Sequence, residues 1–308
     1  MTREKSRGGL GVGIALALLT AALWGLVPVA TKGALGGYTP EVISVLRFGV
    51  AALILRHLAG WGAPWLPRDC WSWIAGVALG VDFILYNYGL QWTSASMSGL
   101  VINVQTVSTI AFAVWLLGER LNGRRVLGSC VTLLGVASLS TADASLADLA
   151  APQHLLGNIM VMLAGISWSL FAVAQRRAPR RLDLFRLLAP IFAVSALTTA
   201  PLLLVPGAWH NPGGMVPTLM LLVLIVFCTI TVYVAYARGQ ELVDISTLAV
   251  VLTTIPIFAV GLAWLILAEP LSPRLVVAGA VIFAGVLVIA TERPAGTTAE
   301  VAAVEHAP

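Results

Sequence analysis

The chain has 308 residues, of which 59% are hydrophobic and 10% are charged, and its mean hydropathy is +0.93. A soluble domain carries about 25% charged residues, so this composition excludes a soluble globular protein and favours one embedded in a membrane. The net charge of +4 comes from Lys and Arg in loops that face anionic headgroups, which makes membrane lipids the expected partner and gives no reason to expect nucleic acid.

About ten apolar stretches of 17 or more residues, mostly free of charge, follow one another along the chain. A helix needs about 20 apolar residues to cross a hydrocarbon core of about 30 Å. The pattern therefore predicts an all-α polytopic membrane protein with ten transmembrane helices. The predicted spans are residues 10–31, 40–58, 71–91, 94–117, 126–142, 155–175, 187–206, 216–237, 245–267 and 275–291.

The basic residues predict the orientation of these spans. With a cytoplasmic N-terminus, 15 of the 18 Lys and Arg fall on cytoplasmic segments, Lys32 and Arg274 fall outside, and Arg47 lies within a span. Cytoplasmic loops carry an excess of Lys and Arg, so both termini are expected in the cytoplasm. The abundance of Arg and Ala favours a bacterial source, hence the cell inner membrane.

The chain also matches itself at a nearly fixed offset. Matched pairs are Tyr86 with Tyr236, Glu119 with Glu269 and Arg124 with Arg274 at an offset of 150, and Trp24 with Trp168 at an offset of 144. Two five-helix repeats are predicted, over residues 9–142 and 154–292, followed by a disordered cytoplasmic tail, 293–308. Since five is odd, the repeats are inverted, which predicts a transporter with a binding site between its halves and alternating access.

Several motifs resemble the two EamA domains of the drug/metabolite transporter superfamily. These are Trp24-Gly25, Pro40, Arg47, Gly118-Glu119-Arg120 and Ala268-Glu269-Pro270. The resemblance covers residues 11–292 and implies a ten-helix secondary transporter, usually an exporter of amino acids or other small metabolites. The second half departs from the pattern, because Ser169 follows Trp168 and Arg47 has no counterpart. This departure implies an asymmetric site.

Arg47 and Asp82 are the ionisable residues deepest in the predicted spans. A charge within the membrane costs about 2.5 to 3.5 kcal/mol on insertion scales and therefore faces a cavity or a partner. Two interpretations stay open. The residues form a structural pair that stabilises the first half, or Asp82 binds a substrate ammonium group or a coupling proton.

A second set of residues is aromatic and polar. The predicted substrate-binding residues are Trp24, Asp82, Tyr86, Asn87, Asn103, Trp168, Tyr236 and Thr253. Thr253 aligns with Asn103, and Pro256 is expected to interrupt the ninth span and free a backbone carbonyl. A cavity lined by such groups suits an amphipathic organic solute, for example an aromatic or hydrophobic amino acid, better than a bare ion. Each ring is alternatively an interhelical contact or an interface anchor.

Other function classes have weaker support. A multidrug or other metabolite permease is the main alternative. An intramembrane enzyme would need a nucleophile or a metal cluster that the sequence does not show, and a scaffold would not require the paired polar groups of the fourth and ninth spans. No cofactor or metal is expected. Small residues in the fifth and tenth spans permit close helix approach, either to each other or in a homodimer. They are Gly128, Ser129, Gly135, Gly279, Ala280 and Gly285.

Overall fold

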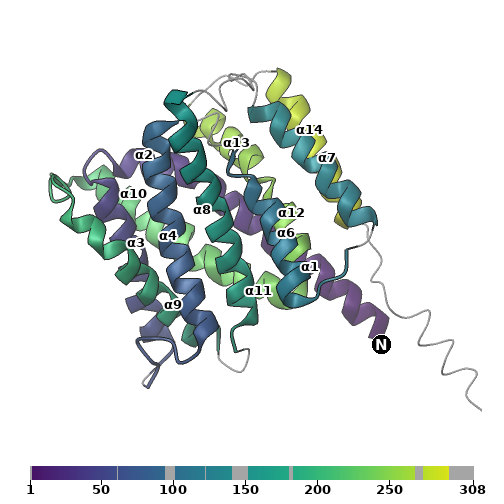
Figure 1. The fold of residues 1–308 in the computed structure, drawn as a ribbon, viewed down its shortest axis with the longest axis horizontal. Coiled ribbons are helices and arrows are strands. Elements are labelled where there is room, and N and C mark those ends of the chain that lie inside the picture. The colour runs from purple at the N-terminus through teal and green to yellow at the C-terminus, as the bar shows by residue number, and fades with distance from the viewer. Residues whose placement is uncertain are drawn as a thin grey trace, which may run out of the picture.

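A computed structural model describes residues 2–60, 62–93, 101–121, 123–140, 152–179, 183–267 and 273–290. The predicted tail, 293–308, and the motif Ala268-Glu269-Pro270 lie outside these residues. Helices make up nearly all of the described chain, and no strand is found in it (Figure 1). The prediction of an all-helical protein is therefore confirmed.

The helices follow the predicted spans closely. In the first half they are α1 (Thr2–Gly25), α2 (Val27–Ala34), α3 (Pro40–Leu58), α4 (Cys70–Trp92), α6 (Val104–Leu117) and α7 (Gly123–Ser140). In the second half they are α8 (Pro152–Arg177), α9 (Leu184–Thr199), η2 (Ala200–Leu204), α10 (Met215–Ile225), η3 (Val226–Thr231), α11 (Val232–Leu242), α12 (Ile245–Leu252), α13 (Ile255–Leu267) and α14 (Pro273–Ala290).

By length and composition, five helical stretches in the described chain are able to cross a membrane. They are Gly9–Ala34, Cys70–Gly89, His154–Arg177, Leu184–Leu204 and Met215–Leu242. Shorter apolar helices are Val104–Leu117, Val126–Ser138, Ile245–Ala259 and Val276–Val288. Together these helices are those of a polytopic membrane protein.

Several of the predicted spans are interrupted, among them the fourth, which breaks at residues 102–103. The first breaks at Leu26, and Pro28 lies in the first turn of α2, where its missing N–H is tolerated. The ninth breaks at residues 253–254, just before Pro256, as the sequence predicted. The eighth contains the π-helix η3 between α10 and α11, which the sequence did not predict. Each break removes regular i to i−4 hydrogen bonds and frees backbone groups for other contacts.

The helices of the two halves interleave. In Figure 1, α7 and α14 lie side by side at one edge, and α4 and α8 run together through the centre. α3 packs against α9, α4 contacts both α8 and α9, and α1 lies along α11. The largest apolar core joins residues of α1, α3, α4, α8, α9, α11 and α12. Neither half therefore has a separate core.

The helices α7 and α14 pack through small residues. A Cβ on Gly135 would lie 2.7 Å from the Ile282 side chain, and a Cβ on Gly285 would meet Thr132. These two contacts are equivalent in the two repeats, because at the offset of 150 Gly135 corresponds to Gly285 and Thr132 corresponds to Ile282. The close approach that the small residues predicted thus occurs between two helices of the same chain.

A second pair of contacts is exchanged in the same way. A Cβ on Gly89 of α4 would lie 3.1 Å from the Gly157 carbonyl oxygen of α8. A Cβ on Gly239 of α11 would lie 3.7 Å from the Gly13 carbonyl oxygen of α1. The offsets of 150 and 144 relate Gly89 to Gly239 and Gly13 to Gly157. The contact of α4 with α8 is thus the counterpart of the contact of α1 with α11.

The α7–α14 contact gives a test of the packing. Gly285→Ala would place its Cβ 2.8 Å from the Gly128 carbonyl oxygen, so the helices must separate, and overpacking of this kind costs about 1 to 3 kcal/mol. Thermal unfolding of the purified protein in detergent should show a lower midpoint.

The matched control is Gly279→Ala in the same helix, where the nearest atom to the new Cβ belongs to the Ile257 side chain, at 3.8 Å. This change should leave the midpoint unchanged or raise it, since Ala favours a helix over Gly by up to about 1 kcal/mol. Equal midpoints for the two variants would contradict the packing.

Candidate functional site

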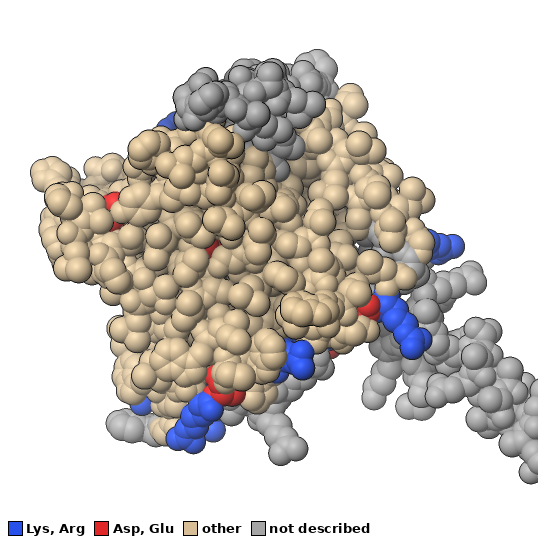
Figure 2. Space-filling view, viewed as in Figure 1, with Lys and Arg blue, Asp and Glu red and all other residues tan. Residues whose placement is uncertain are grey.

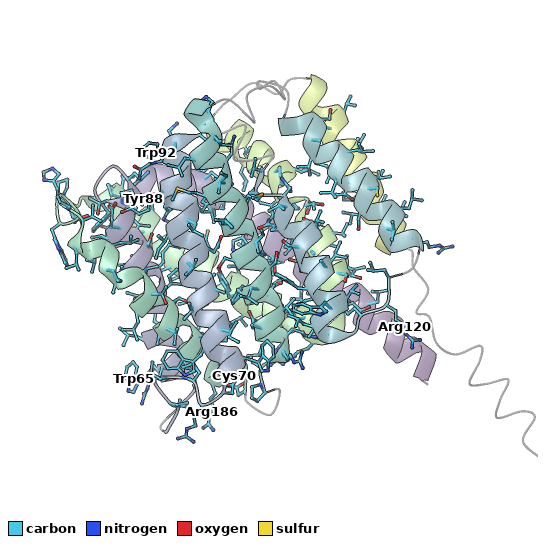
Figure 3. All side chains as sticks on the ribbon, viewed as in Figure 1. Trp65, Cys70, Tyr88, Trp92, Arg120 and Arg186 are labelled. Carbon is cyan, nitrogen blue, oxygen red and sulfur yellow. The ribbon has the colours of Figure 1, made fainter. Side chains whose placement is uncertain are left out.

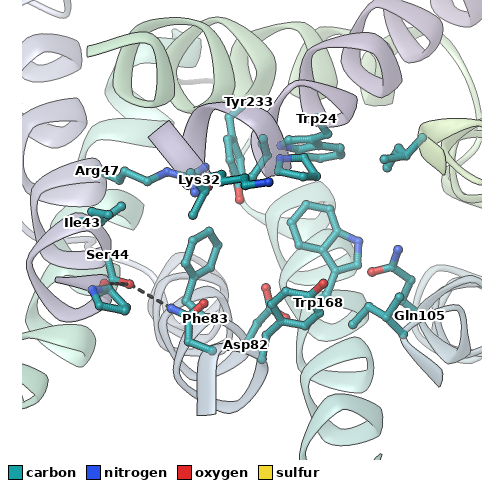
Figure 4. Close-up of a pocket in the computed structure, with 18 of the residues that line it drawn as sticks. Trp24, Lys32, Ile43, Ser44, Arg47, Asp82, Phe83, Gln105, Trp168 and Tyr233 are labelled. Carbon is teal, nitrogen blue, oxygen red and sulfur yellow. Dashed lines mark hydrogen bonds between the residues drawn. The ribbon is translucent and has the colours of Figure 1, made fainter. Parts of the chain in front are cut away.

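A cavity of about 460 Å³ lies between the two halves (Figure 4). Its walls come from α1, α2, α3, α4 and α6 of the first half and from α8, α11, α12 and α13 of the second. Most of its surface is apolar, and polar groups occur at a few positions. Among the residues that line it are Trp24, Thr31, Lys32, Ser44, Arg47, Asp82, Phe83, Tyr86, Asn87, Gln105, Trp168 and Tyr233.

An aromatic cluster, which we call the aromatic floor, closes one side of this cavity. It consists of Trp24, Trp168, Tyr233 and Tyr236. The Trp24 ring lies 4.9 Å from that of Trp168, 5.6 Å from that of Tyr233 and 5.7 Å from that of Tyr236, centroid to centroid. Trp24 meets Trp168 and Tyr233 edge to face, an arrangement that the quadrupoles of aromatic rings favour. Rings from α1, α8 and α11 therefore meet at the boundary between the halves.

Arg47 connects the first half to the π-helix of the second. Its Nε donates to Thr229 Oγ1 at 3.1 Å, and its Nη2 donates to the Cys228 carbonyl oxygen at 3.1 Å. Its guanidinium also lies over the Phe83 ring, 5.0 Å from the centroid. The side chain is 5% exposed and lines the cavity. Arg has five N–H donors, and these two bonds leave three to face the cavity.

The predicted pair of Arg47 and Asp82 is not formed. Both residues line the cavity, but they approach it from different helices (Figure 4). Among the described residues, the hydrogen bonds of Arg47 go to Thr229 and Cys228, and no ion pair joins it to Asp82. The register of α3 turns Arg47 toward η3, which is the physical reason for the difference. Asp82 is 8% exposed, and its carboxylate has no hydrogen-bond partner within the described chain.

The polar groups near the cavity mouth were partly missed by sequence analysis. Lys32 was placed in an outer loop, but it lies on α2 and lines the cavity together with Thr31. The spacing of Pro28, Thr31, Lys32 and Leu35 puts all four on one helix face, which is a signal that could have revealed it.

A hydrogen bond joins two helices of the wall. Asn87 Nδ2 of α4 donates to Ser44 Oγ of α3 at 3.0 Å (Figure 4). The Ser44 hydroxyl in turn donates to the Pro40 carbonyl oxygen at 2.8 Å. The amide of Asn87 is thus held in position at the cavity surface.

Five of the predicted substrate-binding residues line the cavity, and three do not. Trp24, Asp82, Tyr86, Asn87 and Trp168 all line the cavity. The other three are absent from the described lining, and they are Asn103, Tyr236 and Thr253.

Each of these three has another position. Tyr236 is 1% exposed and packs below Trp24 in the aromatic floor. Asn103 is the N-cap of α6. Thr253 is 3% exposed and donates to the Val250 carbonyl oxygen, so its hydroxyl stabilises the break before α13. In the described part of the chain, no group of three or more His, Cys, Asp or Glu is placed to hold a metal ion.

Comparison with known proteins identifies the family. The EamA-like transporter family matches the chain twice, over residues 11–141 and 155–291. The chain belongs to this family. Two matches of similar length agree with the self-similarity of the sequence, and the resemblance noted from the motifs is confirmed.

Relatives are transporters as well. An uncharacterized transporter of Haemophilus influenzae is 24% identical over 81% of this chain and 82% of its own length. The uncharacterized inner membrane transporter YhbE of Escherichia coli is 25% identical over 82% of this chain and 83% of its own. A probable amino-acid metabolite efflux pump of Escherichia coli is 28% identical over 50% of each chain. The protein is therefore a multi-pass membrane transporter.

A solved structure has the same fold. It matches 90% of this chain and 96% of its own with a TM-score of 0.78, at 22% sequence identity.

The contact of Arg47 with η3 gives a second prediction. Thr229→Val removes the acceptor of Arg47 Nε, and it also removes the hydroxyl that donates to the Leu224 carbonyl oxygen at 2.9 Å. Leaving buried polar groups unpaired costs about 1 to 3 kcal/mol each, so the midpoint of thermal unfolding should fall clearly.

Thr231→Val, in the same π-helix, is the control. Its side chain is exposed and makes no hydrogen bond to a described residue, so its removal should change the midpoint little. If Arg47→Leu combined with Thr229→Val were as unstable as the sum of the single changes, the two residues would not be coupled.

Proposed function

We propose that this protein is a secondary transporter that exports small amphipathic solutes, amino acids above all, through the cavity between its halves. The observation that carries the proposal is the combination of a mainly apolar, aromatic wall with two cations, Lys32 and Arg47, and one carboxylate, Asp82. The volume of about 460 Å³ falls within the range of about 300 to 1,000 Å³ that small-molecule sites occupy.

These groups suit the two ends of a zwitterion. The three N–H donors that Arg47 leaves to the cavity match the planar geometry of a carboxylate. Asp82 can accept a hydrogen bond from an ammonium group, and Phe83 and Trp168 offer apolar surface to a side chain. A lipophilic cation would need a carboxylate alone, so the presence of Arg47 and Lys32 beside Asp82 favours a solute that also carries a carboxylate.

We further propose that the chain crosses the membrane ten times as two inverted five-helix repeats. The exchanged contacts support this arrangement, since α4 with α8 and α1 with α11 are counterparts at the offsets that relate the two halves. Two repeats of five spans have opposite orientations in the membrane, and such pairs permit alternating access.

The charge distribution supports cytoplasmic termini. Figure 2 shows most of the visible Lys and Arg along the lower edge of the molecule, and Figure 3 places Arg186 and Cys70 at the same edge. An excess of basic residues marks the cytoplasmic side. Lys32 and the cavity mouth then face outward.

Export is tested with three labelled compounds in inverted membrane vesicles. These are phenylalanine, the amine that lacks its carboxylate, and the acid that lacks its ammonium group. We expect uptake of phenylalanine, and Asp82→Asn should lower uptake of the zwitterion and the amine by about tenfold, as expected when one charge-assisted hydrogen bond of about 1.5 kcal/mol is lost.

Asp183→Asn is the matched control, because this carboxylate is exposed and caps α9 without a side-chain hydrogen bond. It should leave uptake of all three compounds unchanged. If neither these compounds nor any other small metabolite is transported, the proposed function is wrong. If Asp82→Asn lowered the uptake of all three compounds equally, Asp82 would not recognise the ammonium group.

A further inference from the structure

The cavity lies on one side of the aromatic floor, whereas the other side is closely packed. There Phe171 and Ala172 are 0% exposed, and Gln175 is 3% exposed. Gln240 Nε2 of α11 donates to the Ala172 carbonyl oxygen of α8 at 3.0 Å, which holds these two helices together. The structure is therefore closed on the side toward Arg177 and hollow on the side toward Lys32.

The repeat relates residues of the open side to residues of the closed side. Thr31 and Lys32 of the cavity mouth correspond to Gln175 and Arg176 of α8 at the offset of 144 that matches Trp24 with Trp168. A hydrogen-bonding group and a cation thus occur at equivalent places in both halves. Apart from the tryptophans, the flanking residues of these helices match mainly as apolar types, so the polar pair is a specific correspondence.

The aromatic contacts also differ between the closed side and the open side. Tyr236 corresponds to Tyr86, and Tyr233 corresponds to Phe83, at the offset of 150. On the closed side, Trp24 contacts the rings of both Tyr233 and Tyr236. On the open side, Trp168 and Phe83 both line the cavity, and no ring contact joins them in the described chain. The tryptophan of α1 thus contacts the rings of α11, whereas the equivalent tryptophan of α8 does not contact Phe83, although α4 and α8 themselves pack together.

The side-chain amide of Gln175 lacks hydrogen bonds to the described residues in the closed conformation. Its Nε2 and Oε1 are buried, and neither has a hydrogen-bond partner among the described residues. Burying an amide in this way is unfavourable unless the site becomes solvated in another conformation. Arg176 follows this amide directly in α8, and Gln240, whose amide contacts α8 at Ala172, lies one helical turn from Tyr236. A cation and an amide of α8 therefore lie on the closed side, toward the part of the floor that Tyr236 forms.

We propose that Gln175, Arg176 and Tyr236 line a second solute-binding surface, closed in this conformation, that receives the carboxylate end of the solute from the cytoplasmic side. The inference rests on the proposed transport function. When the aromatic contacts of Trp24 with α11 open, those of Trp168 with α4 close, and the solute passes from this surface to the cavity at Arg47. Such states commonly differ by a few kcal/mol, so the open form is populated at about 0.1 to 10%.

Cysteine labelling tests the surface directly. The background is the full chain with Cys70→Ser, Cys130→Ser and Cys228→Ser, because serine keeps the donor to the Leu23 carbonyl oxygen that Cys228 provides. Gln175→Cys and, separately, Ala172→Cys are exposed to a membrane-impermeant thiol reagent from the cytoplasmic face of inverted vesicles.

Both positions should react at least about tenfold faster than Ala189→Cys, because an opening that is populated at about 0.1 to 10% exposes them and not the control. Ala189 is 2% exposed in α9 and belongs, like Ala172, to the apolar core, but α9 does not take part in the hydrogen bond of Gln240 that joins α8 to α11. Phenylalanine should slow the reaction of Gln175→Cys.

Labelling of both test positions at the rate of Ala189→Cys, in vesicles that still transport, would overturn the second surface and leave the proposed function intact. Vesicles of the unchanged protein without transport would instead refute the proposed function.

The role of the cation has its own comparison. Arg176→Gln should lower transport of phenylalanine and of the matched acid while sparing the amine. Arg177→Gln is the control, since Arg177 lies over the Trp71 ring and donates to the Leu116 carbonyl oxygen. Equal effects of the two changes, or an equal loss for all three compounds, would show that Arg176 does not bind the carboxylate.

Discussion

The position of the cavity depends on the hydrogen bonds between Arg47 and the π-helix. A π-helix leaves backbone carbonyls outside the regular ladder, and a carbonyl without a donor costs several kcal/mol in hydrocarbon. Arg47 satisfies the Cys228 carbonyl and the Thr229 hydroxyl together. Because the partners lie in different halves, this contact fixes the distance between α3 and α10–α11. It also fixes the guanidinium at the cavity wall, where its remaining donors face the solute.

The aromatic floor joins the same halves by a different kind of interaction. Each ring contact of Trp24 contributes about 0.5 to 1.5 kcal/mol beyond burial. Such contacts can separate and form again between other rings at little cost. The two contacts therefore have different roles. The Arg47 contact holds α3 against the second half of the chain, whereas the aromatic floor forms a barrier that is able to move.

Much of the fold could be predicted from the sequence, because apolar length and charge pattern determine where membrane helices lie. The cavity was predicted in part. Trp24, Tyr86 and Trp168 line it, and repeat matching had found them. The pairing of Arg47 with Asp82, one of two interpretations that the sequence left open, is not formed in this structure, because depth along a helix says nothing of the direction in which a side chain points. The π-helix and the helical position of Lys32 were missed for a related reason, since both depend on packing between distant helices.

The closed side carries polar contacts that opening must break. Glu119, at the end of α6, accepts hydrogen bonds from the backbone N–H groups of Ile245 and Ser246 at 2.8 and 3.2 Å. A carboxylate at a helix N-terminus is favoured by the helix dipole as well, so this contact holds α6 to α12 at the end near Arg177. Water can replace each of these hydrogen bonds when the side opens. The exchange of protein contacts for hydration keeps the free-energy difference between the two conformations small, as alternating access requires.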